Sequence, residues 1–86
     1  MQEIGRGKVT AEALNSLHSH QFVGNKFLSQ EVIDSLRDGW DERKPAKVYL
    51  CRGRAVELMD GCHRSAYFVL IGKPDYMVPV VFYTDD

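Results

Sequence analysis

The stretch VELMDGCHRSA, residues 56–66, changes character at one glycine, Gly61. Before it, residues 55–59 have the composition of a β-strand. After it, residues 64–71 are apolar almost all round, which predicts a short buried helix. A glycine between a strand and a helix lets the first helical amides, which lack internal partners, converge on an anion. The stretch therefore predicts a strand, a tight turn and a helix, with a phosphate-binding site at the turn.

Three side chains of this turn add chemistry to the backbone amides. Arg64 is a planar, two-pronged donor suited to phosphate, and His63 is a donor or proton carrier near neutral pH. Cys62 is a nucleophile whose thiolate the helix end and Arg64 would favour. Each has a plainer explanation. Arg64 could pair with Asp60 or Glu57, His63 could cap the backbone, and Cys62 could be a small half-buried residue.

The N-terminal half of the chain predicts two helices. Residues 1–8 contain two glycines and little pattern, so we expect a loose start. Thr10 is a good N-cap for a helix over residues 11–17. Ser29 is a second N-cap, and apolar residues follow it at helical spacing. That second helix is expected to end near Gly39.

The C-terminal half predicts a hairpin and a last strand around the Gly61 turn. Residues 47–51 are strand-like, and residues 52–54 form the hairpin turn. Gly72 is a natural C-cap for the buried helix. Residues 77–83 form the last strand, in which Pro79 leaves one side of the ladder open or marks a bulge. The final strand–helix–strand piece is expected to be a right-handed parallel crossover, although it is short for one.

The bulk composition bounds the class of protein. A chain of 86 residues forms one domain at most, over residues 1–86, and 44% apolar with 27% charged residues is typical of a globular protein. A net charge of −1 argues against a polybasic nucleic-acid binder. No apolar run is long enough for a membrane span and no signal peptide is visible, so we expect a cytoplasmic protein without membrane contact. The fold class predicted is α+β (mixed α/β), a short mixed sheet packed with helices.

The two cysteines are predicted to be free thiols. With Gly53 at the centre of the hairpin, Cys51 faces a residue near Ala55 and Cys62 faces a residue near Lys44. The two sulfurs are then about seven residues apart along a strand, roughly 20 Å. A disulfide needs Cα atoms within about 7 Å.

The remaining charged and titratable residues give weaker signals. Arg52 and Arg54 on the hairpin tip are either solvated or in contact with a nucleic-acid backbone. Asp60 is either structural or a helper for Mg²⁺. His18 and His20 would face different ways on a helix, so no metal site is predicted there. Basic residues cluster in one stretch, which allows a local positive site on a nearly neutral protein: Lys44, Lys47, Arg52, Arg54 and Arg64.

Residues 56–66, the apolar helix up to Gly72 and the strand Val78-Pro79-Val80-Val81 together resemble the core of the ParB/sulfiredoxin superfamily. Members carry a strand that ends in a Gly-x-His-Arg or Gly-Glu-Arg-Arg turn, followed by a helix and a Val/Pro-type strand. The resemblance covers residues 47–83, and more loosely the helix before them. It implies a small ParB/sulfiredoxin-like domain.

The sulfiredoxin branch carries Gly-Cys-His-Arg, which residues 61–64 reproduce. That likeness implies Cys62 as the nucleophile, with the turn amides, His63 and Arg64 holding ATP phosphates and Mg²⁺ while a peroxiredoxin sulfinic acid is reduced. Sulfiredoxins usually have Phe-Gly-Gly before the cysteine, whereas this chain has Met59-Asp60-Gly61. That departure puts the reductase reading in doubt.

The run Asp60-Gly61-x-His63-Arg64 is closer to the ParB-like branch, which binds nucleoside triphosphates and includes ATPases and nucleases. The resemblance implies ATP or CTP with Mg²⁺ as cofactor, DNA as a possible partner, and Cys62, His63 and Arg64 as catalytic residues. The implied cofactor-binding residues are Asp60, Gly61, Cys62, His63, Arg64 and Ser65. Two alternatives stay open, a sulfiredoxin-like reductase and a non-catalytic inhibitor or adaptor that binds a protein partner.

Overall fold

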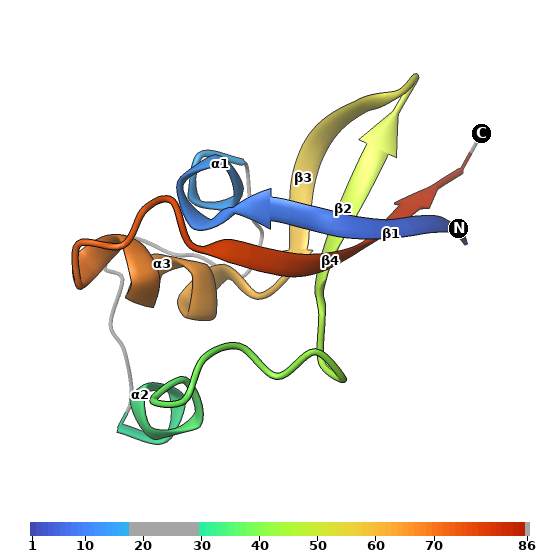
Figure 1. Ribbon diagram of the computed structural model, residues 1–86. Coiled ribbons are helices and arrows are strands. Elements are labelled where there is room, and N and C mark those ends of the chain that lie inside the picture. The colour runs from blue at the N-terminus through green and yellow to red at the C-terminus, as the bar shows by residue number, and fades with distance from the viewer. Residues whose placement is uncertain (18–29, 86) are drawn as a thin grey trace.

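The computed structural model describes residues 1–17 and 30–85, which form a four-stranded sheet with three helices (Figure 1). In chain order the elements are β1 (Gln2–Thr10), α1 (Ala11–Asn15), α2 (Gln30–Ser35), β2 (Ala46–Cys51), β3 (Arg54–Asp60), α3 (Cys62–Leu70) and β4 (Met77–Thr84). The predicted α+β class is confirmed. The predicted cap Ser29 and the pair His18 and His20 lie outside the described residues.

The sheet is mixed, with the strand order β1-β4-β2-β3. β4 runs antiparallel to β1 and parallel to β2, and β3 runs antiparallel to β2. The residues from Val78 to Val81 are all buried, which shows that both faces of β4 are covered there. The β2–β4 ladder begins at Val80, so β4 is open on that side at Pro79, as predicted.

The predicted parallel crossover from β3 to β4 is wrong. The hairpin reverses the chain direction before α3 begins, so β3 and β4 run in opposite directions with β2 between them. The parallel partner of β4 is β2, and the chain between these two strands includes the rest of the hairpin and α3.

The predicted loose start over residues 1–8 is also wrong, because residues 2–8 belong to β1. This strand pairs with β4 from Gln2 opposite Thr84 to Thr10 opposite Met77, with a register shift between Glu3 and Gly5. The ladder is made by backbone groups, which every such residue carries. Pairing therefore needs no alternating side-chain pattern, and this segment has none.

β2 and β3 form the predicted hairpin. Arg52 and Gly53 make its two-residue turn with φ values of 53° and 79°, the positive φ at both positions that a type I′ turn requires. Cys51 lies opposite Arg54 instead of Ala55, so the predicted register is off by one residue at this point. Both cysteines are free thiols, as predicted.

The helix ends follow local capping. Thr10 is the predicted N-cap of α1, and its Oγ1 accepts a hydrogen bond from the Ala13 amide at 3.2 Å. α2 ends at Ser35, earlier than predicted, because the next residues form turns: the Gly39 amide donates to the carbonyl oxygen of residue 36 at 3.0 Å. α3 begins two residues before its predicted start, at Cys62. Cys62, His63 and Arg64, which were expected in the turn, therefore lie in the first turn of α3.

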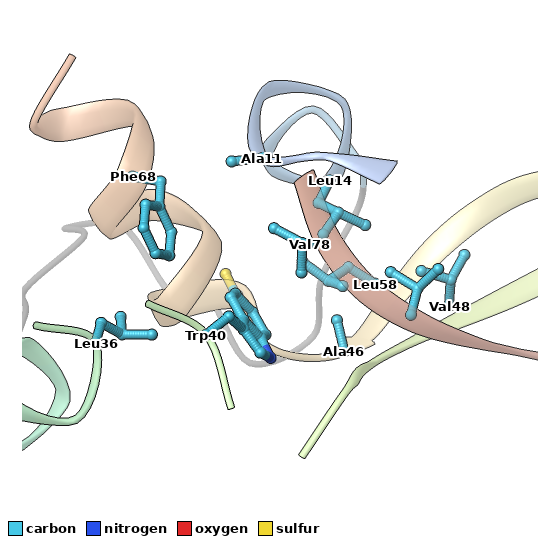
Figure 2. Close-up of a cluster of buried hydrophobic side chains, with 11 residues drawn as sticks. Ala11, Leu14, Leu36, Trp40, Ala46, Val48, Leu58, Phe68 and Val78 are labelled. Atoms are coloured by element: carbon cyan, nitrogen blue, oxygen red, sulfur yellow. The ribbon is translucent and has the colours of Figure 1, made fainter. Parts of the chain in front are cut away.

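The core lies where α1 and α3 meet the sheet (Figure 2). Leu14 of α1 and Phe68 of α3 are buried, and the Phe68 ring stacks on Tyr76 with centroids 3.9 Å apart. Trp40, from the connection between α2 and β2, stacks on Phe68 at 6.3 Å. The buried cluster consists of Ala11, Leu14, Leu36, Trp40, Ala46, Val48, Leu58, Cys62, Phe68, Val78 and Val80. Within residues 1–17 and 30–85, no helix is long and apolar enough to cross a membrane.

Candidate functional site

The Gly61 turn joins β3 to α3 and packs closely on its neighbours. Gly61 has φ 103° and ψ 12°, and a Cβ at this position would lie 3.0 Å from the Cβ of Ala46 and 3.2 Å from Cη2 of Trp40. The glycine offers no side chain to cap α3. The first hydrogen bond inside the helix runs from the Ser65 amide to the Gly61 carbonyl oxygen at 2.9 Å. The amides of residues 62–64 therefore have no partner within the helix.

Arg64 is tied to the segment that precedes β2. Its guanidinium lies over the Trp40 ring, with Cζ 4.3 Å from a ring centroid. Arg64 Nη1 donates to the Lys44 carbonyl oxygen at 2.7 Å, and the same oxygen accepts a hydrogen bond from Trp40 Nε1 at 2.8 Å. Nη2 lies 3.8 Å from Asp60 Oδ2. Burial lowers the pKa of Arg64, an effect that Asp60 and Asp41 oppose, and the group keeps its charge at neutral pH.

Two adjoining hollows open beside this turn. The larger, of about 480 Å³, lies between the C-terminal end of α2, the segment before β2 and the end of β3. The smaller, of about 180 Å³, lies at the start of α3 and shares Ser35, Asp60 and Arg64 with the larger. We call the two together the turn cleft. Beyond the three shared residues, the larger hollow is lined by Leu36, Asp41, Arg43, Lys44, Pro45 and Lys47.

The charges of the larger hollow do not cancel. It has four basic and two acidic side chains. Asp41 pairs with Arg43, whose Nε lies 3.2 Å from Oδ1, and this hydrogen bond is the main reason that the pKa of Asp41 is lowered and that of Arg43 is raised. Asp60 faces the guanidinium described above. Lys44 and Lys47 have no ion pair with any described residue, although Lys44 is close enough to Asp41 to help lower the pKa of that carboxyl. They are the two basic residues of the hollow whose ammonium groups no described carboxylate holds in a close pair.

The structure brings most of the predicted site residues together but not all. Asp60, Gly61, His63 and Arg64 line the smaller hollow, and His63 is half-buried there. Ser65 does not fit its predicted role in cofactor binding. It is fully buried, and its hydroxyl donates to the carbonyl oxygen of residue 62 at 3.0 Å, one turn back in the same helix.

Cys62 lies deeper than the half-buried position considered from the sequence. It borders the smaller hollow, but only 6% of the residue is exposed and it belongs to the core cluster. The predicted nucleophile is therefore largely shielded from anything that approaches from the hollow.

Arg52 and Arg54 lie elsewhere. They are exposed at the tip of the β2–β3 hairpin, which projects away from the helices (Figure 1). β3 runs from Arg54 to Asp60, so the tip and the Gly61 turn are at opposite ends of one strand, about 20 Å apart. Any contact that these arginines make with nucleic acid uses a surface separate from the turn cleft.

The sequence did not indicate that the segment before β2 contributes to this site. Nothing in the motif indicated Trp40, yet its indole lies against both Gly61 and Arg64. The signal that could have indicated this segment was the predicted hairpin register, because it placed Lys44 near Cys62. The described part of the chain has no group of three or more His, Cys, Asp or Glu side chains that could hold a metal ion.

Comparison of the chain with protein-family models, with curated proteins and with solved structures finds no match. The resemblance to the ParB/sulfiredoxin superfamily therefore stays a prediction. Functional proposals for this chain rest on the geometry of the turn cleft.

Proposed function

We propose that the protein binds the phosphate groups of a nucleoside triphosphate, ATP or CTP with Mg²⁺, at the Gly61 turn. The observation that carries this proposal is the uncapped start of α3, where the amides of residues 62–64 have no helical partner and border a hollow. The helix dipole favours an anion at this end. His63 on the same wall supplies a further donor.

The turn cleft has room for more than the phosphates. Its larger hollow, at about 480 Å³, falls within the usual range for small-molecule sites, roughly 300–1,000 Å³. Mg²⁺ commonly reaches such sites on the phosphates themselves, held by one or two protein carboxylates. Asp60, which borders both hollows, is the carboxylate placed to serve this role.

The proposal extends to catalysis: the same site would hydrolyse the nucleotide or cleave DNA. The turn amides and positive side chains would stabilise negative charge on phosphoryl oxygens, which is the main catalytic need in phosphoryl transfer. His63 would donate a proton or a hydrogen bond. A cytoplasmic location belongs to this proposal, because a reducing compartment keeps the exposed Cys51 thiol free.

The two alternatives have less support. A sulfiredoxin-like reductase needs a sulfur that a protein sulfinic acid can reach, whereas Cys62 is buried in the core. An adaptor or inhibitor would need a surface for a protein partner, and the exposed apolar residues Leu70, Ile71 and Met77 are candidates for one, but no feature of the described residues identifies the partner. We therefore place nucleotide-phosphate binding first.

The test is a titration of ¹⁵N-labelled protein with ATP, CTP and GTP in the presence of Mg²⁺, followed by amide NMR shifts. We expect saturable shifts that are largest at residues 62–64, and weaker binding in His63→Ala. Arg54→Ala is the matched control, because this exposed residue lies at the far end of β3 and should leave the affinity unchanged. Absence of saturable binding, or shifts centred on the hairpin tip, would overturn the proposal and favour the adaptor alternative.

A further inference from the structure

We propose that the cations of this site that bind the outer phosphates of a polyphosphate ligand are Lys44 and Lys47, and that Arg64 is a positioning residue for Lys44. This inference rests on the proposed nucleotide site and says what selects a triphosphate over a single phosphate. The phosphate role predicted for Arg64 thereby passes to two residues outside the motif.

Arg64 is anchored within the fold, although it borders both hollows. One face of its guanidinium covers Trp40, and Nη1 donates to the Lys44 carbonyl oxygen at 2.7 Å. Only 20% of the side chain is exposed. If Arg64 turned toward a phosphate, it would give up the hydrogen bond and uncover the ring. A guanidinium held by a ring and a carbonyl oxygen is placed to fix the backbone of Lys44 at the hollow.

Lys44 and Lys47, in contrast, are placed to bind phosphate directly. The Lys44 carbonyl oxygen accepts hydrogen bonds from two side chains, Arg64 and Trp40, so its backbone is anchored at the hollow while the side chain is exposed. Lys47 in β2 lies opposite Asp60, the residue directly before the Gly61 turn. An ammonium group binds phosphate as a point charge and does not need the rigid geometry of a guanidinium.

The distribution of charge sets the class of ligand. A single phosphate at the start of α3 would occupy the smaller hollow and leave both lysines, which line only the larger one, without a partner. A chain of phosphates would continue into the larger hollow. The carboxylates there, Asp41 and Asp60, are already matched by Arg43 and Arg64. The lysines therefore favour a diphosphate or triphosphate.

Calorimetry that compares the binding of AMP, ATP and inorganic tripolyphosphate, each with Mg²⁺, tests this inference. For the wild type we expect ATP and tripolyphosphate to bind at least about tenfold more tightly than AMP. Lys44→Gln and Lys47→Gln should each weaken ATP binding about fivefold and leave AMP binding unchanged. The matched control is Lys73→Gln, an exposed lysine outside the turn cleft, which should bind both nucleotides like the wild type.

Arg64 is tested in the same assay by a double-mutant cycle. A positioning role predicts that Arg64→Ala weakens ATP binding but not AMP binding, and that it adds little to Lys44→Gln. If Arg64 bound phosphate directly, the losses would be additive and AMP would also bind more weakly. Arg64→Lys, which keeps the charge but loses the planar fork, provides the same contrast if the alanine variant does not fold.

The outcomes separate the two proposals. Binding of AMP and ATP with equal affinity, or an ATP preference that survives both lysine substitutions, would overturn this inference and leave the nucleotide site standing. An Arg64→Ala variant that weakens AMP binding would overturn the positioning role. If the wild type binds none of the three ligands, the proposed function and this inference fail together.

Discussion

Replacement of Gly61 by alanine tests whether the packing of the turn requires a residue without a side chain. Gly61 is buried, has φ 103°, and an added Cβ would meet the Cβ of Ala46 at 3.0 Å and the Trp40 ring at 3.2 Å. Gly53 in the hairpin provides the matched control. Its φ is also positive, at 79°, but no atom lies within 4 Å of the added Cβ. The two substitutions share the backbone cost and differ in packing.

The expected loss of stability follows from these contacts. A left-handed backbone costs an alanine about 1–2 kcal/mol, and overpacking of a closely packed site costs about 1–3 kcal/mol. Both variants regain about 0.4–1 kcal/mol from a less flexible unfolded chain. We expect Gly61→Ala to lose about 2–4 kcal/mol and Gly53→Ala about 1 kcal/mol. A protein of this size has about 4–13 kcal/mol in total, so the first loss is severe.

Urea denaturation followed by circular dichroism measures both losses. With a slope of about 1 kcal/mol per molar urea, Gly61→Ala should lower the midpoint by about 2 M or more. Ala46→Gly in the Gly61→Ala background removes the nearest contact, so the double variant should lose less than the sum of the single losses. Equal losses at Gly61 and Gly53, or strict additivity with Ala46→Gly, would refute the packing argument.

Three further predictions concern a cap, an ion pair and the thiols. Thr10→Ala should cost about 1 kcal/mol in urea denaturation because it removes the side-chain cap of α1, whereas Thr10→Ser should keep most of the stability. The pKa of Asp41 is lowered in the folded state, chiefly by its hydrogen bond with Arg43. The stability that this carboxylate contributes is therefore present above its unfolded pKa near 3.8 and is lost as the pH falls through the folded value. Asp41→Asn should lower the Tm at pH 7 and match the wild type at pH 2, and a difference in Tm that stays the same at both pH values would contradict this. Cys51 is exposed and Cys62 is buried, so a thiol reagent should modify the first rapidly and the second only on unfolding; rapid modification of both would reopen the reductase alternative.

The fold could be predicted from the sequence where local signals decide it. The cap at Thr10, the hairpin turn at Gly53 and the turn at Gly61 each depend on a few neighbouring residues, and the structure contains all three. β1 was missed because its partner, β4, lies at the other end of the sequence. A segment with little alternation shows no sign of a backbone ladder until its partner is known.

The candidate site was only half predictable for a similar reason. The motif pointed to Gly61, His63 and Arg64, and these residues do border one hollow. The motif could not show that Arg64 is held by Trp40 and the Lys44 carbonyl oxygen, since that depends on how the segment before β2 packs. Ser65 illustrates the same limit, because a step of one residue rotates a side chain by about 100° around the helix axis, and this step turns Ser65 toward the core.

The ladder between β1 and β4 also shapes how this chain reaches its native state. It joins Gln2 to Thr84 and Thr10 to Met77, so a loop that contains most of the chain must close before even the innermost of these pairs can form. Closing so long a loop is slow compared with making the β2–β3 hairpin, which needs only a two-residue turn. We expect the hairpin to form early and β1 to dock last. Until β1 arrives, the apolar edge of β4 is exposed, and this interval is when the chain is most prone to self-association.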